Sequence, residues 1–81
     1  MRADDVLEWV RAAPFVPFRI RLNSGRAYDI RHPEMVRVGR TTAYIFSYFG
    51  NPPDLVEKME MVGLVLIEAI EPLERAPSQK S

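Results

Sequence analysis

Apolar and charged residues alternate through the first half of the chain. Residues 18–22 read Phe-Arg-Ile-Arg-Leu, the two-residue period of a strand with one buried and one solvent-facing side. Asn23-Ser24-Gly25 follows, and glycine can adopt the positive φ that closes a short hairpin loop. Residues 27–31 then alternate again until His32-Pro33, where proline has no N–H to donate. The pattern predicts a β-hairpin that ends at this proline.

Two further strands are expected over residues 35–49. Residues 35–38 alternate once more, and Gly39-Arg40-Thr41 offers the next turn. Residues 42–49 read Thr-Ala-Tyr-Ile-Phe-Ser-Tyr-Phe and are apolar on both faces. Either both faces are covered within the domain, or one face or edge contacts another chain, because long apolar edges invite aggregation. Self-association is the simpler cover, and the predicted intersubunit contacts are Tyr44, Ile45, Phe46 and Tyr48.

Residues 3–13 predict an amphipathic helix that precedes these strands. Apolar residues recur there at helical spacing, Asp4 or Asp5 can cap the helix, and Pro14 ends it. Trp9 lies beside the apolar stripe. We expect its ring to cover an open end of the sheet.

The second half of the chain is less regular. Residues 50–54, Gly-Asn-Pro-Pro-Asp, are the strongest loop signal. Residues 55–61 fit either a short helix or a strand, and we favour a loop followed by a strand. Residues 62–67 form a continuous apolar run that predicts a buried strand, in which Gly63 indicates a bulge or bend.

The last structured residues are expected to form a short edge strand. Glu68-Ala69 predicts a tight turn, and residues 70–73 form the strand, with Pro72 ending its pairing. Residues 75–81 are polar and lack apolar anchors, which predicts a disordered tail. The chain is therefore interpreted as one domain over residues 1–74, with the helix at 3–13 and the β-meander at 17–73.

Composition narrows the class of protein. The 81 residues are 47% hydrophobic and 27% charged, as in ordinary globular domains, and contain no cysteine. Disulfides, thiolate nucleophiles and cysteine-based metal sites are thereby excluded. The acidic start has no apolar core of a signal peptide, and no apolar run reaches membrane-spanning length. We expect a cytoplasmic protein without membrane contact.

The charges are segregated along the chain although the formal net charge is zero. Residues 1–50 hold eight arginines against five acidic residues, and residues 51–81 hold three basic against six acidic residues. We favour pairing of the two halves, within one chain or between copies, over nucleic-acid binding. The alternative is a phosphate-binding sheet face, for which the candidate residues are Arg19, Arg21, Arg31 and Arg37.

Catalytic chemistry finds little support. His32 is the only histidine, so a metal site with two histidines cannot form. Asp29, His32 and Glu34 lie close in sequence, but a solvated turn-capping cluster is the favoured interpretation over a proton relay. The glycines are dispersed and form no phosphate-binding loop. We expect neither an enzyme nor a bound cofactor or metal.

Two segments carry a resemblance to a known fold. Residues 20–28, Ile-Arg-Leu-Asn-Ser-Gly-Arg-Ala-Tyr, are similar to the first Sm motif, and residues 65–70, Val-Leu-Ile-Glu-Ala-Ile, are placed like the second. A helix followed by a bent five-stranded antiparallel meander also resembles the Sm-like fold over residues 3–73. The resemblance implies assembly by edge pairing into rings that bind RNA.

The residues that bind RNA in that family have no counterpart here. The asparagine of the RNA-binding loop would fall near His32-Pro33-Glu34, and the second motif's basic residues would fall near residues 65–69, which read Val-Leu-Ile-Glu-Ala. The chain also resembles a group of short bacterial proteins of unknown function. That resemblance rests on residues 17–22, 32–34, 38–40 and 70–73.

These observations predict a mainly β domain with an N-terminal helix and a small, strongly bent, five-stranded, barrel-like meander of Sm-like or SH3-like type. The expected function is a non-enzymatic assembly or protein-interaction module. The expected partner is a second copy or another protein. An RNA-binding Sm-like protein is the alternative.

Overall fold

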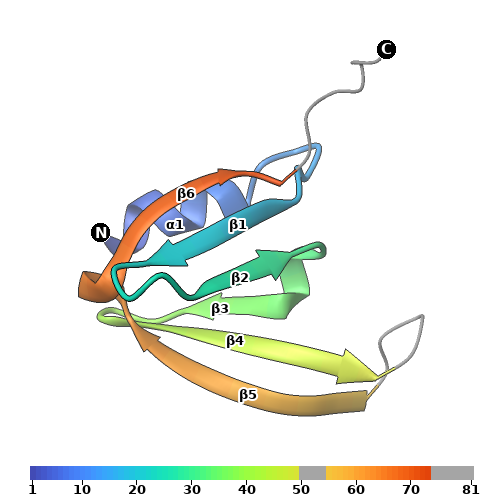
Figure 1. Ribbon diagram of the computed structural model, residues 1–81. Helices are drawn as coiled ribbons and strands as arrows, with labels where there is room; N and C mark the ends of the chain where they lie inside the picture. The colour runs from blue at the N-terminus through green and yellow to red at the C-terminus, as the bar shows by residue number, and fades with distance from the viewer. Residues whose placement is uncertain (50–54, 74–81) are drawn as a thin grey trace.

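The computed structural model describes residues 1–49 and 55–73, which form one helix, two short 3-10 turns and six strands (Figure 1). The expected loop at residues 50–54 and the expected tail at 75–81 lie outside the described residues. In chain order the elements are α1 (Ala3–Val10), β1 (Phe18–Leu22), β2 (Ala27–Ile30), η1 (Pro33–Met35), β3 (Val36–Val38), β4 (Thr42–Phe49), β5 (Leu55–Gly63), η2 (Leu64–Leu66) and β6 (Ile67–Pro72).

The strands form two antiparallel sheets of three strands each, in the orders β2-β1-β6 and β3-β4-β5. The first hairpin turns at Gly25, whose φ of 98° is the left-handed conformation that glycine adopts at little cost. Leu22 and Arg26 are joined across this turn by a backbone hydrogen bond of 2.8 Å. The chain passes between the sheets twice, through η1 from β2 to β3 and through η2 from β5 to β6 (Figure 1).

The inner faces of the two sheets pack on each other to form the core. Burial alternates strictly along β1, where the three apolar residues are buried and the two arginines are partly exposed. The buried apolar residues come from α1, η2 and both sheets: Val6, Phe18, Ile20, Leu22, Ile30, Val36, Ala43, Ile45, Val62, Leu64 and Ile67. The alternation therefore predicted the buried side of β1 correctly.

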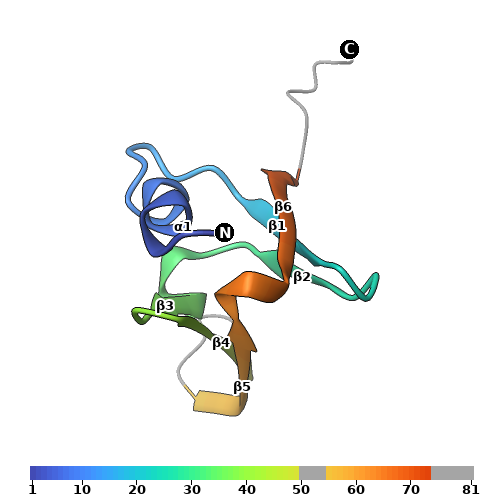
Figure 2. The same cartoon turned by 90° about the vertical axis from the view of Figure 1, so that its left-hand side faces the viewer.

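Helix α1 covers one open side of this sandwich. It packs against β3, and Figure 2 shows it end-on beside that strand. The Trp9 and Phe18 ring centroids lie 5.5 Å apart, so the tryptophan ring lies on the core as expected. The helix is shorter than predicted and ends at Val10. Arg11, Ala12 and Ala13 are exposed, so a further helical turn would bury nothing.

The apolar run at residues 62–67 is not a continuous strand, which corrects the prediction. Gly63 ends β5, η2 turns the chain, and β6 begins at Ile67. The predicted tight turn at Glu68-Ala69 is also wrong, because both residues lie within β6. Within η2 only Leu64 reaches the core, whereas Val65 and Leu66 are 79% and 49% exposed; Val62 before the turn and Ile67 after it are buried.

The described residues form six strands where five were expected. For residues 55–61 the favoured interpretation, a loop followed by a strand, is wrong for the loop, because all of these residues belong to β5, which pairs with β4. The described strands form no closed barrel, since the pairing comprises two separate sheets. What the structure shows is a mainly β fold with one N-terminal helix. Across the described residues, no helix has the length and apolar character needed to cross a membrane.

Candidate interaction surface

Charged side chains on the outer face of the β2-β1-β6 sheet pair with one another across the strands. Arg19 lies opposite Asp29 in the register, and its Nε donates to Asp29 Oδ1 at 2.8 Å. On the other side of β1, Arg21 Nη2 donates to Glu71 Oε2. All four side chains are about 40% exposed. Both arginines of β1 therefore have a carboxylate partner, and little positive charge on them is uncompensated.

The Arg19–Asp29 pair shifts the proton affinity of both groups. The hydrogen bond from Arg19 lowers the pKa of Asp29, and the charges of Arg19 and Arg31 act in the same direction. The same hydrogen bond raises the pKa of Arg19. The pair is thus fully charged at neutral pH.

The four arginines predicted as a phosphate-binding face do not share one face. Arg19 and Arg21 lie on the outer face of the β2-β1-β6 sheet. Arg31 follows the end of β2, and its charge acts on Asp29. Arg37 lies on β3 opposite Tyr44, in the other sheet. The set is therefore divided between two surfaces of the molecule.

Glu60 connects the two sheets, a contact that the sequence pattern did not predict. Tyr28 donates its hydroxyl hydrogen to Glu60 Oε1 at 3.0 Å, and Arg26 Nη2 donates to the same oxygen at 2.9 Å. Lys58 Nζ lies 3.5 Å from Glu60 Oε2. The hydrogen bond from Tyr28 is the main cause that lowers the pKa of Glu60, while burial raises the pKa of Tyr28. A charged carboxylate of β5 is thereby held by two residues of the first hairpin.

The outer face of β4 and β5 is apolar. The register places Tyr44 opposite Met61, Phe46 opposite Met59 and Tyr48 opposite Val56, so all six side chains point to the same side of the sheet. The β5 members are exposed: Met61 at 67%, Val56 at 52% and Met59 at 46%. We call these six residues the apolar outer face.

The aromatic residues of this face are held in place by their surroundings. Phe46 and Tyr48 have ring centroids 6.4 Å apart, and the Tyr48 hydroxyl donates to the Glu34 backbone carbonyl at 2.8 Å. The Tyr44 ring lies over Gly39, where an added Cβ would come within 3.2 Å of Tyr44 Cε2. Contacts within the chain therefore hold the aromatic side chains of the apolar outer face in defined positions.

The structure separates Ile45 from the other predicted contact residues. Ile45 is 4% exposed and belongs to the core, because it alternates with its neighbours along β4. Tyr44, Phe46 and Tyr48 share the opposite face. A contact through this strand therefore uses its aromatic side and leaves Ile45 inside the domain. The exposed methionines of β5, Met59 and Met61, are not among the predicted contact residues, because the sequence leaves the conformation of that segment ambiguous.

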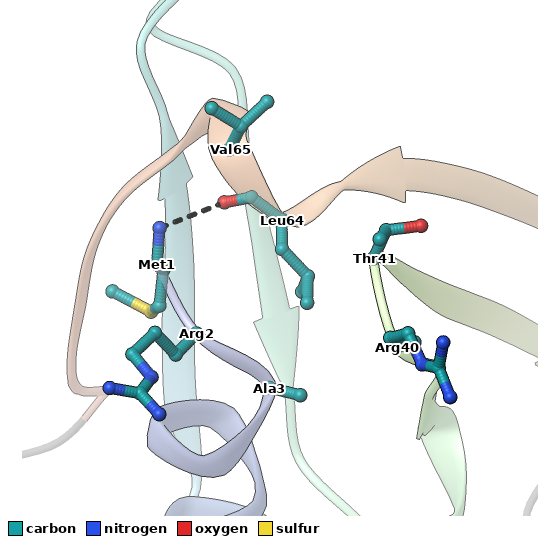
Figure 3. Close-up of a pocket in the computed structure, with 7 residues that line it drawn as sticks. All are labelled: Met1, Arg2, Ala3, Arg40, Thr41, Leu64 and Val65. Carbon is teal, nitrogen blue, oxygen red and sulfur yellow. Dashed lines mark hydrogen bonds between the residues drawn. The ribbon is translucent and has the colours of Figure 1, made fainter.

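A shallow groove lies between the start of α1 and η2 (Figure 3). Its volume is about 590 Å³, and it is lined by Met1, Arg2, Ala3, Arg40, Thr41, Leu64 and Val65. The Met1 amino group donates to the Leu64 carbonyl at 3.3 Å. In Figure 3 the guanidinium groups of Arg2 and Arg40 lie on opposite sides and point away from each other, so they do not converge on one anion.

Asp29, His32 and Glu34 each have different surroundings in the structure. Asp29 is held by Arg19, and the exposed His32 precedes η1. Glu34 is exposed within η1 and takes part in the Tyr48 contact through its backbone. Among the described residues, no group of three or more His, Cys, Asp or Glu side chains is placed to hold a metal ion.

Comparison of the chain with protein-family models, with curated proteins and with solved structures finds no match.

Proposed function

We propose that this protein is a small, non-enzymatic β assembly module that associates with further copies of itself through the β3-β4-β5 sheet. The observation that carries the proposal is the apolar outer face, on which Met59, Met61 and Val56 are about half exposed or more beside three aromatic residues. Contiguous exposed apolar surface of this kind is typical of protein–protein contact sites.

A second copy is the proposed partner because the apolar outer face continues to the free edge of β5. β5 is the last strand in its sheet and has no strand partner on its other side among the described residues. Another copy of the chain carries the same long strand, so it supplies a complementary backbone edge as well as an apolar surface.

The finer fold assignment belongs to the same proposal. We propose that the two sheets form a bent, barrel-like arrangement of Sm-like or SH3-like type. The observations that support it are the helix before the first strand and the two passages of the chain between sheets, through η1 and η2. The absence of the family's RNA-binding residues from the corresponding positions favours assembly over RNA binding.

The test is the mass in solution, measured by light scattering over a dilution series. We expect a mass above that of one chain for the unmodified protein. Met61→Glu introduces a charge at the most exposed position of the apolar outer face and should reduce the mass towards one chain while the circular dichroism stays unchanged. Val16→Glu is the matched control, because Val16 is 42% exposed but lies outside both sheets.

Two results would contradict the proposal. One is a single-chain mass for the unmodified protein across the whole dilution series. The other is a Met61→Glu variant that keeps the parent mass, since the apolar outer face would then not be the contact. Phe46→Glu provides an independent variant on the neighbouring strand.

A further inference from the structure

The free edge of β5 has a charge pattern that is complementary to itself. β5 spans nine residues, Leu55–Gly63, and lies at the edge of the β3-β4-β5 sheet (Figure 1). Lys58 and Glu60 point to its inner side, opposite Ser47 and Ile45 of β4, and Met59 between them points outward. A basic and an acidic residue thus flank one apolar residue on an unpaired edge.

Two copies of β5 can pair antiparallel about a two-fold axis at one residue, and the axis position determines which charges meet. An axis at Met59 places Lys58 of each copy opposite Glu60 of the other. An axis at Lys58 places two lysines opposite each other, and an axis at Glu60 places two glutamates opposite each other. Like charges directly opposite are destabilising, whereas opposite charges stabilise the pair.

We infer that β5 pairs with β5 of a second copy, antiparallel, with the two-fold axis at Met59 and Lys58 opposite Glu60 in both directions. This inference rests on the proposed self-association and specifies its geometry. An axis between two residues is excluded by the pleat, since it would set inner side chains opposite outer ones.

The surroundings of β5 fit this register. The pairing of β5 with β4 is irregular between Val56 and Lys58. Met59, the proposed centre, lies beyond this irregularity in the regular part of β5. Arg26 and Tyr28 already hold Glu60, which keeps its carboxylate charged and in a defined position. Lys58 is 63% exposed in its side chain, and its Nζ lies 3.5 Å from Glu60 Oε2 of its own chain, so Glu60 of a second copy would be a second carboxylate beside the same ammonium group.

The pairing also unites the two apolar surfaces. Met59 of each copy lies next to the other on the outer side, and the apolar outer faces join into one surface across a six-stranded sheet. The exposed backbone edge of β5 gains hydrogen-bond partners. A single chain leaves the apolar outer face and the backbone edge of β5 uncovered. The proposed dimer uses both.

Cysteine cross-linking tests the register, because the chain contains no cysteine. Met59→Cys places two thiols at directly opposed positions, where Cα atoms about 4.5–5.5 Å apart permit a disulfide. Met61→Cys is the matched control on the same face. Its two copies would be offset by four residues, about 13 Å along the strand, which is beyond disulfide reach.

We expect Met59→Cys to form the covalent dimer at least about tenfold faster than Met61→Cys at micromolar protein, because paired strands raise the effective thiol concentration. Met61 is the more exposed, 67% against 46%, so random collision would favour Met61→Cys instead. Equal rates, or faster cross-linking at position 61, would overturn the register.

Charge reversal gives a second, independent test. Lys58→Glu alone sets glutamates opposite each other, and Glu60→Lys alone sets lysines opposite each other, so each variant should fall to a single-chain mass. An equimolar mixture pairs glutamates with lysines in both directions and should regain the dimer. Thermal unfolding of each variant shows whether loss of the Arg26 and Tyr28 contacts affects the fold of Glu60→Lys.

The outcomes separate the register from the proposed function. A single-chain mass for the unmodified protein rejects self-association and the register together. An unmodified protein that associates, but shows no preference for cross-linking at position 59, rejects the register alone. Folded Lys58→Glu and Glu60→Lys variants that do not associate when mixed also reject the register, whatever the parent mass.

Discussion

Both sheets bury apolar side chains on their inner faces, but their outer faces differ in character. One is charged, and the other, over β4 and β5, is apolar. On the β2-β1-β6 sheet, the outward side chains of Arg19, Asp29, Arg21 and Glu71 form two ion pairs within the chain. On the β3-β4-β5 sheet, the outward side chains of β4 and β5 are aromatic or apolar and remain partly exposed. Exposed ion pairs contribute little to stability but leave the surface solvated and electrically balanced. The comparison shows that the β4–β5 side is the more apolar of the two outer surfaces, which is why the proposed contact is placed there.

The largest expected effect distinguishes the inner from the outer side of one strand. Ile45→Ala removes a core side chain that is 4% exposed and should lower the free energy of unfolding by about 2–5 kcal/mol. Phe46→Ala, one residue further on the outer face, should cost less in the isolated chain but reduce self-association. Urea denaturation at a concentration where the chain is monomeric measures the first effect, and light scattering measures the second.

The prediction is wrong if Ile45→Ala and Phe46→Ala have the same effects. Equal destabilisation by Phe46→Ala would show that the outer face is packed within a single chain. Unchanged association with Phe46→Ala would show that β4 does not contribute to the contact.

A smaller effect is expected at the hydrogen bond that joins the two sheets. Tyr28→Phe removes the hydroxyl that donates to Glu60 Oε1 and should cost about 1 kcal/mol of the free energy of unfolding. The pKa of Glu60 should rise towards its ordinary value, because this hydrogen bond is the main cause that lowers it. Carboxyl chemical shifts followed by NMR over a pH titration measure the pKa.

Tyr48→Phe is the matched control for that experiment. Its hydroxyl donates to the Glu34 backbone carbonyl on the outer side, away from Glu60. The pKa of Glu60 should therefore not change in Tyr48→Phe. An unchanged pKa in Tyr28→Phe would contradict the role of the tyrosine hydroxyl.

Acid should weaken the folded state through two carboxylates, Asp29 on the charged outer face and Glu60 in the contact between the sheets. The pKa values of Asp29 and Glu60 are lower in the folded chain than their ordinary values near 4, so the unfolded chain binds more protons in acid. Their stabilisation is present above the unfolded pKa and is lost as the pH falls through the folded values. The melting temperature should be steady from pH 7 to 5 and decline below about pH 4.

The double variant Asp29→Asn, Glu60→Gln tests the source of this decline. It should show a lower melting temperature at neutral pH and a shallower decline in acid. A decline as steep as that of the parent would assign the acid sensitivity to other carboxyl groups.

Local pattern was sufficient for much of this fold. The alternation of residues 18–22, the turn at Gly25 and the break at His32-Pro33 each depend on neighbouring residues, and the structure confirms all three. The position of Trp9 was also predictable, because an aromatic residue beside an apolar helical stripe has few other places to pack.

Features that depend on register were not predictable. The apolar run 62–67 predicts one strand with a bend at Gly63, but the pattern does not show that the strand ends there and that η2 carries the chain into the other sheet. Ile45 and Phe46 are both apolar, and only their pairing partners and burial show which one faces the core. The contacts of Arg21 with Glu71 and of Tyr28 with Glu60 join residues far apart in sequence, which composition alone cannot match.

The smallest effect on stability is expected from the charged outer face, where it also tests the alternative function. Asp29→Ala with Glu71→Ala leaves the core intact but removes the partners of Arg19 and Arg21. Uncompensated arginines attract phosphate, so this variant should gain weak binding to single-stranded RNA that disappears as salt is raised. The unmodified protein should show no such binding, because its carboxylates already occupy both guanidinium groups. If the unmodified protein instead bound RNA in a salt-sensitive manner, and Arg19→Ala with Arg21→Ala abolished the binding, the charged face would be the functional one and the comparison of the two sheets would be reversed.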